Sequence, residues 1–149
     1  MLSLLVHAAL GILTTVLSFR FNGHLYERGS RASGVSALEA LYYAIATGSV
    51  LTGWYFNIAY VKTYPDQASW AHFTKMLFTN PAASSGAQDL IVTNAILFPL
   101  WTIVDGPRRG LRQAWIFFVM SLFTSFGFSM GLYLAAQERQ VRWKAARPA

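Results

Sequence analysis

The stretch NPAASSGAQDLIVTNAILFPLWTIV, Asn80 to Val104, decides the fold because it begins like a helix and then stays apolar. Asn80 is a favoured N-cap residue, and Pro81 suits the first helical position, where a missing N–H leaves no hydrogen bond unmade. A helix from Pro81 to Val104 rises about 36 Å, which exceeds the ~30 Å hydrocarbon core of a bilayer. The stretch therefore predicts a membrane-spanning helix over residues 82–104.

Three further segments are equally poor in charge. The chain has 149 residues, of which 54% are hydrophobic and 12% charged, whereas globular domains carry about 25% charged residues. Because a span needs about 20 mostly apolar residues, further spans are predicted over residues 2–19, 38–61 and 114–137. The expected fold is an all-α integral membrane protein with four transmembrane helices in one domain, residues 1–149. It is multi-pass, and in a bacterium it would lie in the cytoplasmic membrane.

The first of these spans is expected to be retained. Residues 1–19 lack the basic start and the A-x-A cleavage site of a signal peptide. A short amphipathic helix is predicted at the interface over residues 66–78, because Trp70, Phe73 and Leu77 share one helical face. The tail, residues 138–149, is basic.

Local signals refine the helix boundaries. Ser36-Ala37-Leu38-Glu39 fits a capping box, in which Glu39 reaches back to the cap amide. Pro99 predicts a kink near residues 95–98, because a proline frees the carbonyl four residues earlier. Asp105-Gly106-Pro107 is predicted to end the helix.

Asp89 is the candidate site residue, because it lies about 12 Å from the helix start, at or inside the hydrocarbon boundary. Two interpretations stay open. The carboxylate pairs with an arginine or hydroxyl of another span, or it carries a proton or binds a ligand. The other candidates for ligand binding or assembly are Asn80, Asn94, Arg108 and Arg109.

The last predicted span carries a helix-packing pattern. Ser121, Ser125 and Ser129 recur every four residues, and Gly127 and Gly131 form a G-x-x-x-G pair. Small residues at this spacing let membrane helices approach closely. The pattern predicts a packing face for another helix of this chain or of a partner.

Composition excludes several classes of site. The chain has no cysteine, so it has no disulfide, thiolate nucleophile or cysteine metal site. His72 has no partner at metal-ligand spacing, and no metal or cofactor is predicted beyond a possible bound carotenoid, quinone or lipid. The net charge of +6 comes from residues that flank the spans, so the expected partners are membrane lipids rather than nucleic acid.

The four-span prediction does not decide the orientation of the chain in the membrane. With four spans, the N-terminus, the loop after the second span and the tail share a side. Each side then carries six of the twelve Lys and Arg residues, so the positive-inside rule gives no answer.

The chain resembles a mostly bacterial family known as domain of unknown function 2834 over about residues 41–139. The carrying stretches are LFTNPAASSGAQDL, VDGPRRGLRQAW and GLYLAAQER. The resemblance implies a small three-span membrane protein, to which residues 1–19 would be an addition. The acid-bearing AQDL piece and the topology are also similar to plant membrane proteins needed to make the carotenoid neoxanthin.

Three functions follow as hypotheses. The preferred one is a non-enzymatic accessory subunit of a membrane complex, or a lipophile-binding bundle, which packs against other subunits or itself. The second is an enzyme acting on an isoprenoid, carotenoid or quinone, with Asp89 as acid/base and Arg108 as its charge partner. The third is a small proton-coupled transporter. Because no catalytic motif is visible in the sequence, the enzyme question leans towards no.

Overall fold

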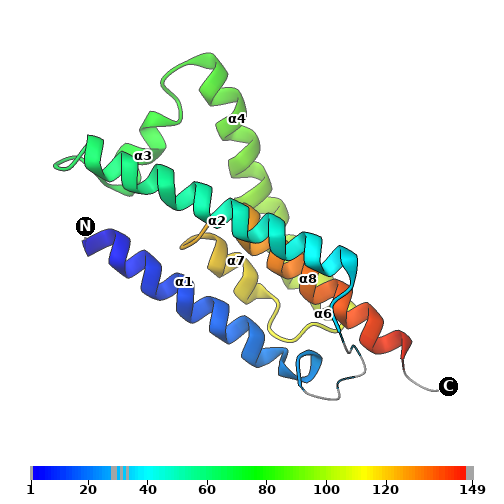
Figure 1. Ribbon diagram of the computed structural model, residues 1–149. Helices are drawn as coiled ribbons and strands as arrows, with labels where there is room; N and C mark the ends of the chain where they lie inside the picture. Colours follow the sequence, from blue (N-terminus) through cyan, green and yellow to red (C-terminus); the bar gives the residue numbers. More distant parts are fainter. Residues whose placement is uncertain (1, 28–29, 31, 33, 147–149) are drawn as a thin grey trace.

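The computed structural model describes residues 2–27, 30, 32 and 34–146, which form helices joined by turns (Figure 1). No strand occurs among these residues, and the all-α prediction is confirmed. The elements are α1 (Leu2–Phe21), η1 (Gly23–Leu25), α2 (Ala37–Thr63), α3 (Trp70–Met76), α4 (Pro81–Val92), η2 (Thr93–Leu97), α5 (Phe98–Leu100), η3 (Trp101–Asp105), α6 (Gly106–Arg109), α7 (Trp115–Ser121) and α8 (Phe126–Ala145).

Two predicted helix starts are confirmed by their caps. The Ser36 side chain accepts a hydrogen bond from the backbone N–H of Glu39 at 3.1 Å, and α2 begins at the next residue. The Asn80 side chain accepts one from the N–H of Ala83 at 2.9 Å, with Pro81 in the first turn of α4. In both caps a side-chain oxygen satisfies an N–H that the helix leaves free.

The helix that begins with α4 passes through Pro99 and continues to the end of α6. The turns η2 and η3, on either side of Pro99, are π-helical, and the N–H of Phe98 bonds to the carbonyl of Thr93. Such wider turns accommodate a residue that cannot make the ordinary helical bond. The prediction that Asp105-Gly106-Pro107 ends the helix is wrong. Gly110 ends it, with a left-handed φ of 98°.

The fourth predicted span, over residues 114–137, is wrong as one helix. The chain reverses at residues 122–125, and α7 and α8 lie antiparallel as a helical hairpin. Phe117 of α7 contacts two residues of α8. Its carbonyl accepts the Ser129 hydroxyl, and its ring lies 5.5 Å from that of Tyr133. Ser125 accepts the N–H of Phe128 at 3.1 Å and caps α8, which offers the backbone an alternative to a continuous helix.

The hairpin separates the serines that were predicted to form one row. Ser121 lies in α7 and donates to Asn94 of η2 at 2.8 Å. Ser125 caps α8 and lies 3.0 Å from the hydroxyl of Ser49 in α2. Ser129 faces α7. The three side chains therefore contact three different elements. The prediction from the i, i+4 spacing missed this because it assumed that residues 114–137 form one straight helix.

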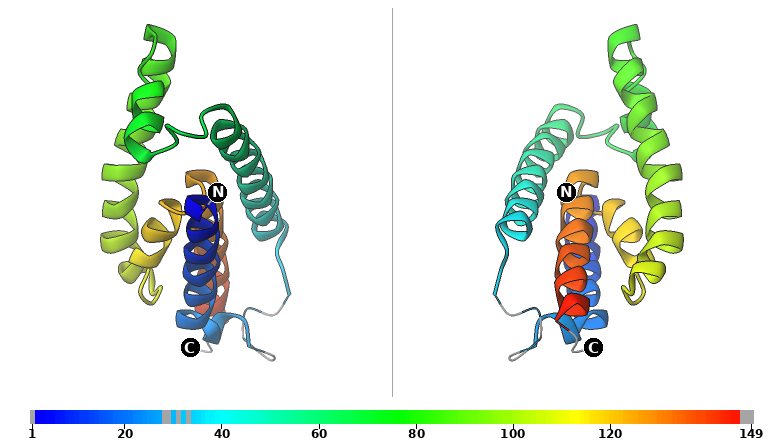
Figure 2. Two further views of the ribbon diagram at one scale, coloured as in Figure 1. Left: turned by 90° about the vertical axis from the view of Figure 1, so that its left-hand side faces the viewer. Right: turned by 90° about the vertical axis from the view of Figure 1, so that its right-hand side faces the viewer.

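The reversal also places the two termini at opposite ends of the molecule (Figures 1 and 2). Trp70 of α3 donates its indole N–H to His7 at 3.2 Å, so the start of α1 lies beside α3. Asn22, after α1, bonds both ways with the backbone of Arg112 at 2.9 and 3.1 Å. Gly110 lies against Lys144 near the end of α8. The predicted sharing of one side by the N-terminus and the tail is wrong.

Helices α2 and α8 pack closely through the glycines of α8. A Cβ added at Gly131 would lie 2.9 Å from both the Ala46 Cβ and the Tyr42 carbonyl oxygen. One added at Gly127 would lie 2.9 Å from the Ser49 Cβ. Small residues permit this approach between helices, so the G-x-x-x-G pair lies at a contact within the chain.

A buried ion cluster joins the start of α2 to the end of α8. Glu39 is fully buried, and its carboxylate accepts Arg139 Nε at 2.7 Å, the Tyr43 hydroxyl at 3.0 Å and a guanidinium N–H of Arg142. The Arg139 guanidinium lies 4.7 Å from the ring centre of Tyr26. Burial raises the pKa of the Tyr26 phenol, which keeps the ring neutral. The prediction that Glu39 only completes a capping box is wrong, because its side chain bonds to the arginines instead.

Among the residues that the structure describes, two helical stretches are long and apolar enough to cross a membrane, Leu4–Phe21 and Pro81–Arg109. The four-span prediction is thereby corrected in part. Helix α2 has 27 residues, but its tyrosines, threonines and Asn57 lower its hydropathy. Neither α7, with 7 residues, nor α8, which ends in charged residues, is a continuous apolar span. The predicted interfacial segment 66–78 contains the shorter helix α3.

Candidate ligand cavity

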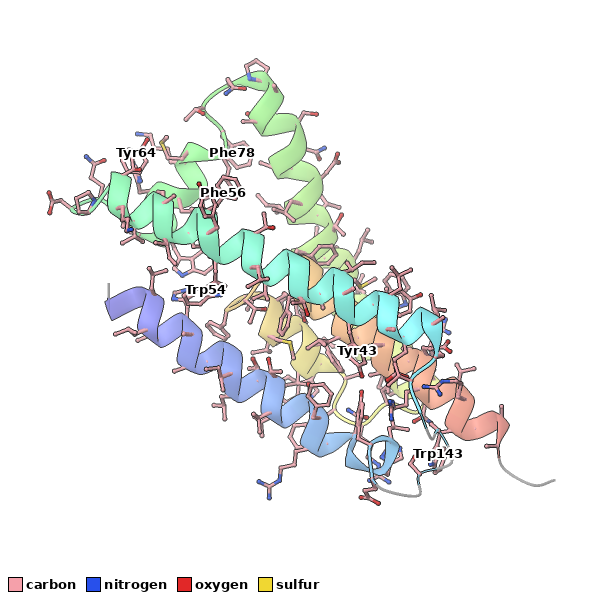
Figure 3. The ribbon with its side chains drawn as sticks, in the orientation of Figure 1. Tyr43, Trp54, Phe56, Tyr64, Phe78 and Trp143 are labelled. Carbon is pink, nitrogen blue, oxygen red and sulfur yellow. The ribbon has the colours of Figure 1, made fainter. Side chains whose placement is uncertain are left out.

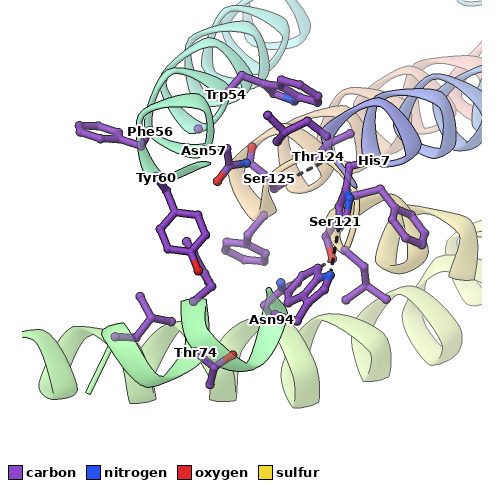
Figure 4. Close-up of a pocket in the computed structure, with 18 of the residues that line it drawn as sticks. His7, Trp54, Phe56, Asn57, Tyr60, Thr74, Asn94, Ser121, Thr124 and Ser125 are labelled. Atoms are coloured by element: carbon purple, nitrogen blue, oxygen red, sulfur yellow. Dashed lines mark hydrogen bonds between the residues drawn. The ribbon is translucent and has the colours of Figure 1, made fainter. Parts of the chain in front are cut away.

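A cavity of about 570 Å³ lies between α2 and the α4–η2 stretch (Figure 4). The turn between α7 and α8 forms its floor, α3 covers it, and the first turns of α1 border one side. A volume of roughly 300–1,000 Å³ is typical of sites for small organic ligands. We call this space the central cavity.

Aromatic residues from α2, α3 and the α7–α8 turn contribute to the walls of the central cavity. Figure 3 shows Trp54 extending from α2 into the space beside α1. Tyr60 of α2 lies 2.8 Å from the His72 ring nitrogen in α3, and its ring packs 5.3 Å from Phe73. Together with the Trp70–His7 hydrogen bond, these contacts hold α3 over the cavity. The Trp, Tyr and Phe residues among the described lining are Trp54, Phe56, Tyr60, Trp70, Phe73, Phe123 and Phe126.

The floor is the α7–α8 turn, which reaches the middle of three long helices. The turn packs on Gly11, where an added Cβ would lie 2.8 Å from Thr124. It bonds to Ser49 through Ser125 and to Asn94 through Ser121. Gly11, Ser49 and Asn94 each lie near the midpoint of α1, α2 and the α4–α6 helix, respectively. The hairpin tip therefore stands halfway along the bundle and leaves the space above it open.

Two carboxamides supply hydrogen-bonding groups to this space (Figure 4). The Asn94 side-chain oxygen accepts the Ser121 hydroxyl at 2.8 Å, which leaves its NH₂ as a donor. Asn57 of α2 is half-buried in the lining. Within the described part of the chain, neither the Asn94 NH₂ nor the Asn57 amide has a hydrogen-bond partner. The cavity can therefore bond an oxygen of a ligand whose remaining surface is apolar.

The remaining predicted site residues lie away from the central cavity. Asp89 is exposed on the outer face of α4, where Gln88 donates to it. Arg108 is 19 residues further along the same helix, about 28 Å away, so the two do not pair. Arg109 pairs with Asp105, and Asn80 caps α4. Of the predicted ligand-binding candidates, the structure brings only Asn94 to the cavity.

The described part of the chain does not indicate a metal-binding site. No group of three or more His, Asp or Glu side chains there could hold a metal ion. The cavity itself is lined by one histidine and no carboxylate. The described lining offers hydrogen-bonding groups on an otherwise apolar wall.

One protein family matches this chain, with the description protein of unknown function DUF2834, over residues 41–139. The chain belongs to that family. No curated protein and no solved structure matches it. The DUF2834 match begins inside α2 and ends at Arg139, so α1 lies outside it. Of the cavity-lining residues, only Leu4 and His7 come from outside the match. The cavity is thus built mainly from the family's own segment.

The sequence analysis missed most of the cavity for an identifiable reason. Of the two cavity amides, the sequence singled out Asn94 and not Asn57. The available signal was the concentration of Trp, Tyr, Phe and Asn in GWYFNIAY, at the end of α2, opposite the polar FTS turn. Their convergence depends on the chain reversal at residues 122–125, which the sequence alone did not reveal.

Proposed function

We propose that this chain is a small multi-pass membrane protein that binds an elongated lipophile in the central cavity. The ligand class is an apolar molecule that ends in a hydroxyl or carbonyl oxygen, such as a quinone, a carotenoid or a lipid. The observation that carries the proposal is the cavity itself, with aromatic residues in its walls and with the Asn57 amide and the Asn94 NH₂ available to bond a ligand.

Membrane embedding is supported by the exposure of large apolar side chains. Such residues are exposed along α1, α2 and the α4–α6 helix, with Ile12 66%, Leu51 67% and Leu100 56% exposed. Several polar residues, including Thr14, Thr102 and Ser129, are buried beside the apolar core. Soluble proteins rarely expose such large apolar surfaces. We infer that α1, α2 and the α4–α6 helix cross the bilayer and that the α7–α8 hairpin enters it from one side.

A hairpin tip inside a bilayer favours a cavity that takes a polar group. Irregular backbone at membrane depth is tolerated where it is buried in protein or lines a cavity. Here the turn is partly covered by Gly11 and Ser49, and its remaining face borders the central cavity. A ligand oxygen placed near Asn94 would satisfy an amide donor that lipid tails leave without a partner.

Assembly with other membrane subunits stays a prediction. The outer face of α4 carries Ala82, Ser85 and Gly86 beside Asp89, all of them exposed. Such small residues would allow a second helix to approach and to shield the carboxylate. This face is separate from the cavity, so the binding proposal does not depend on it.

Filling the cavity should weaken ligand binding. Ala95 lines the cavity, and the neighbouring Ile96 points outwards. With the protein in detergent, we expect a short-chain ubiquinone analogue to quench the fluorescence of Trp54 and Trp70. Ala95→Phe should weaken this binding by about tenfold or more, because an inserted ring costs about 1–3 kcal/mol of overlap with a bound ligand.

The matched control is Ile96→Phe, which adds a ring one residue away on the lipid-facing side. It should bind the quinone as the wild-type protein does. Saturable quenching that persists unchanged in Ala95→Phe, or that survives Trp54→Phe/Trp70→Phe, would place the quinone elsewhere and overturn the proposal.

Asp89→Asn should leave the same quinone titration within about twofold of wild type, because less than 0.5 kcal/mol is expected at a surface site away from the ligand. The side chain points away from the cavity and has Gln88 as its neighbour. The enzyme hypothesis assigns Asp89 the acid/base role at the ligand. A tenfold or larger loss of binding in Asp89→Asn would favour that hypothesis over ours.

A further inference from the structure

One end of the molecule collects the ends of five helices. Arg139 of α8 bonds to Glu39 at the start of α2 at 2.7 Å, and Asn22 after α1 bonds to the backbone of Arg112 before α7. Gly110, after α6, lies against Lys144. Figure 3 shows Trp143 at this end, far from Trp54. We call it the basic end and call the opposite end, with α3, the α3 end.

The hairpin makes the distribution of cations strongly unequal. Of the described Lys and Arg residues, the α3 end carries Lys62 and Lys75. The basic end carries Arg20, Arg108, Arg109, Arg112, Arg139, Arg142 and Lys144. The four-span prediction gave equal numbers of Lys and Arg residues on the two sides because it placed the basic tail on the same side as the N-terminus. Because Lys and Arg are enriched on the cytoplasmic side of membrane proteins, the basic end has the composition of a cytoplasmic face.

Several cations of the basic end are available to bind an anion. Arg139 and Arg142 are taken up by Glu39, and Arg109 by Asp105. Four exposed cations have no carboxylate partner within the described part of the chain, namely Arg20, Arg108, Arg112 and Lys144. They come from the ends of α1, α6 and α8 and the turn before α7, so all four lie at the basic end. At the α3 end, the two lysines are matched in number by Asp66 and Asp89, whereas the seven described cations of the basic end face four acids, Glu27, Glu39, Asp105 and Glu138.

We propose that the basic end binds the phosphate headgroups of anionic lipids in the cytoplasmic leaflet. The N-terminus and α3 then lie on the opposite side of the membrane from the C-terminus. The inference rests on the membrane embedding proposed above. It adds an orientation, a lipid partner and three crossings with a hairpin that enters from the cytoplasm. Charge complementarity selects anionic headgroups, because each cation near the surface strengthens attraction to them.

Single cysteines test the orientation cleanly, because the natural chain has none. Gln67→Cys lies in the exposed turn before α3, and Ala146→Cys lies just after α8. In intact cells, a membrane-impermeant maleimide should label Gln67→Cys and should label Ala146→Cys only after permeabilisation. Labelling of both cysteines, or of Ala146→Cys alone, in intact cells would overturn the inference. Labelling of neither cysteine until the cells are permeabilised would overturn it as well. Both cysteines would then lie on the cytoplasmic side, and the four-span arrangement is the one that puts them on the same side.

Lipid selectivity tests the partner. The protein is purified from vesicles that contain equal amounts of phosphatidylglycerol and phosphatidylcholine, and the lipid that stays bound to it is measured. More phosphatidylglycerol than phosphatidylcholine should remain bound. The variant Arg20→Gln/Arg108→Gln/Arg112→Gln/Lys144→Gln should lose that preference, by about fivefold for each cation neutralised. The control Lys62→Gln/Lys75→Gln should keep it. Equal retention of the two lipids by the wild type would contradict the inference. Quinone quenching in the same samples reports separately on the cavity proposal.

Discussion

Glu39→Gln is expected to lower the free energy of unfolding by about 3–5 kcal/mol, the range seen when one partner of a buried ion pair is removed. The carboxylate is fully buried and bonds to Arg139, Arg142 and Tyr43. Glutamine has the same shape but leaves the Arg139 guanidinium without its counter-charge and leaves Arg142 with Glu138 alone. Arg139 keeps its bonds to the carbonyl oxygens of Leu25 and Gly34, so the fold is weakened rather than abolished.

The measurement is unfolding in mixed detergent micelles, followed by circular dichroism. Glu138→Gln is the matched control, because Glu138 is partly exposed and lies 3.6 Å from Arg142. It should lose less than about 1 kcal/mol, as exposed ion pairs do. If the two variants lost the same amount, the cluster around Glu39 would not stabilise the α2–α8 contact as the structure indicates.

Two glycine-to-alanine substitutions should change stability in opposite directions. Gly131→Ala is expected to cost about 1–3 kcal/mol, because the new Cβ would overlap the Tyr42 carbonyl and Ala46. Gly48→Ala lies in α2, where no atom would be within 4 Å of the added Cβ. It should stabilise the protein by about 0.5–1 kcal/mol, since alanine restricts the unfolded chain and favours the helix.

The same micelle titration measures both glycine variants. Gly131→Ala should in addition weaken quinone binding, because separating α8 from α2 shifts the Ser125 turn that forms the cavity floor. Stabilisation of both variants by the same amount would show that helix propensity, and not the α2–α8 approach, governs these positions.

The parts of the fold that follow local rules could be predicted from the sequence. Asn80 and Ser36 cap their helices as expected, because an N-cap depends on a few consecutive residues. The helix content and the long helix after Pro81 also follow from local composition. The position of the helix distortion near Pro99 was predicted, but its π-helical form was not. The wider π-helical turns accommodate the proline without interrupting the helix.

The parts that depend on contacts between distant residues could not be predicted. An apolar run of 24 residues fits one span or two antiparallel half-spans, and only the packing of Gly11 and Ser49 around the turn distinguishes them. Glu39 satisfies a local capping pattern, yet its partner lies 100 residues away. Asp89 was selected as a candidate because it is an acid in an apolar helix. The direction of its side chain, however, depends on which face of α4 packs against the other helices.

The most direct test of the central claim is to purify the protein from native membranes in mild detergent and to identify the molecules that accompany it. Mass spectrometry and an absorption spectrum of the organic extract should show a stoichiometric lipophile with a hydroxyl or carbonyl end in the wild type. Ile96→Phe should keep it, and Ala95→Phe should lose it. A chain that emerges without any lipophile, or an extract that Ala95→Phe leaves unchanged, would contradict the account.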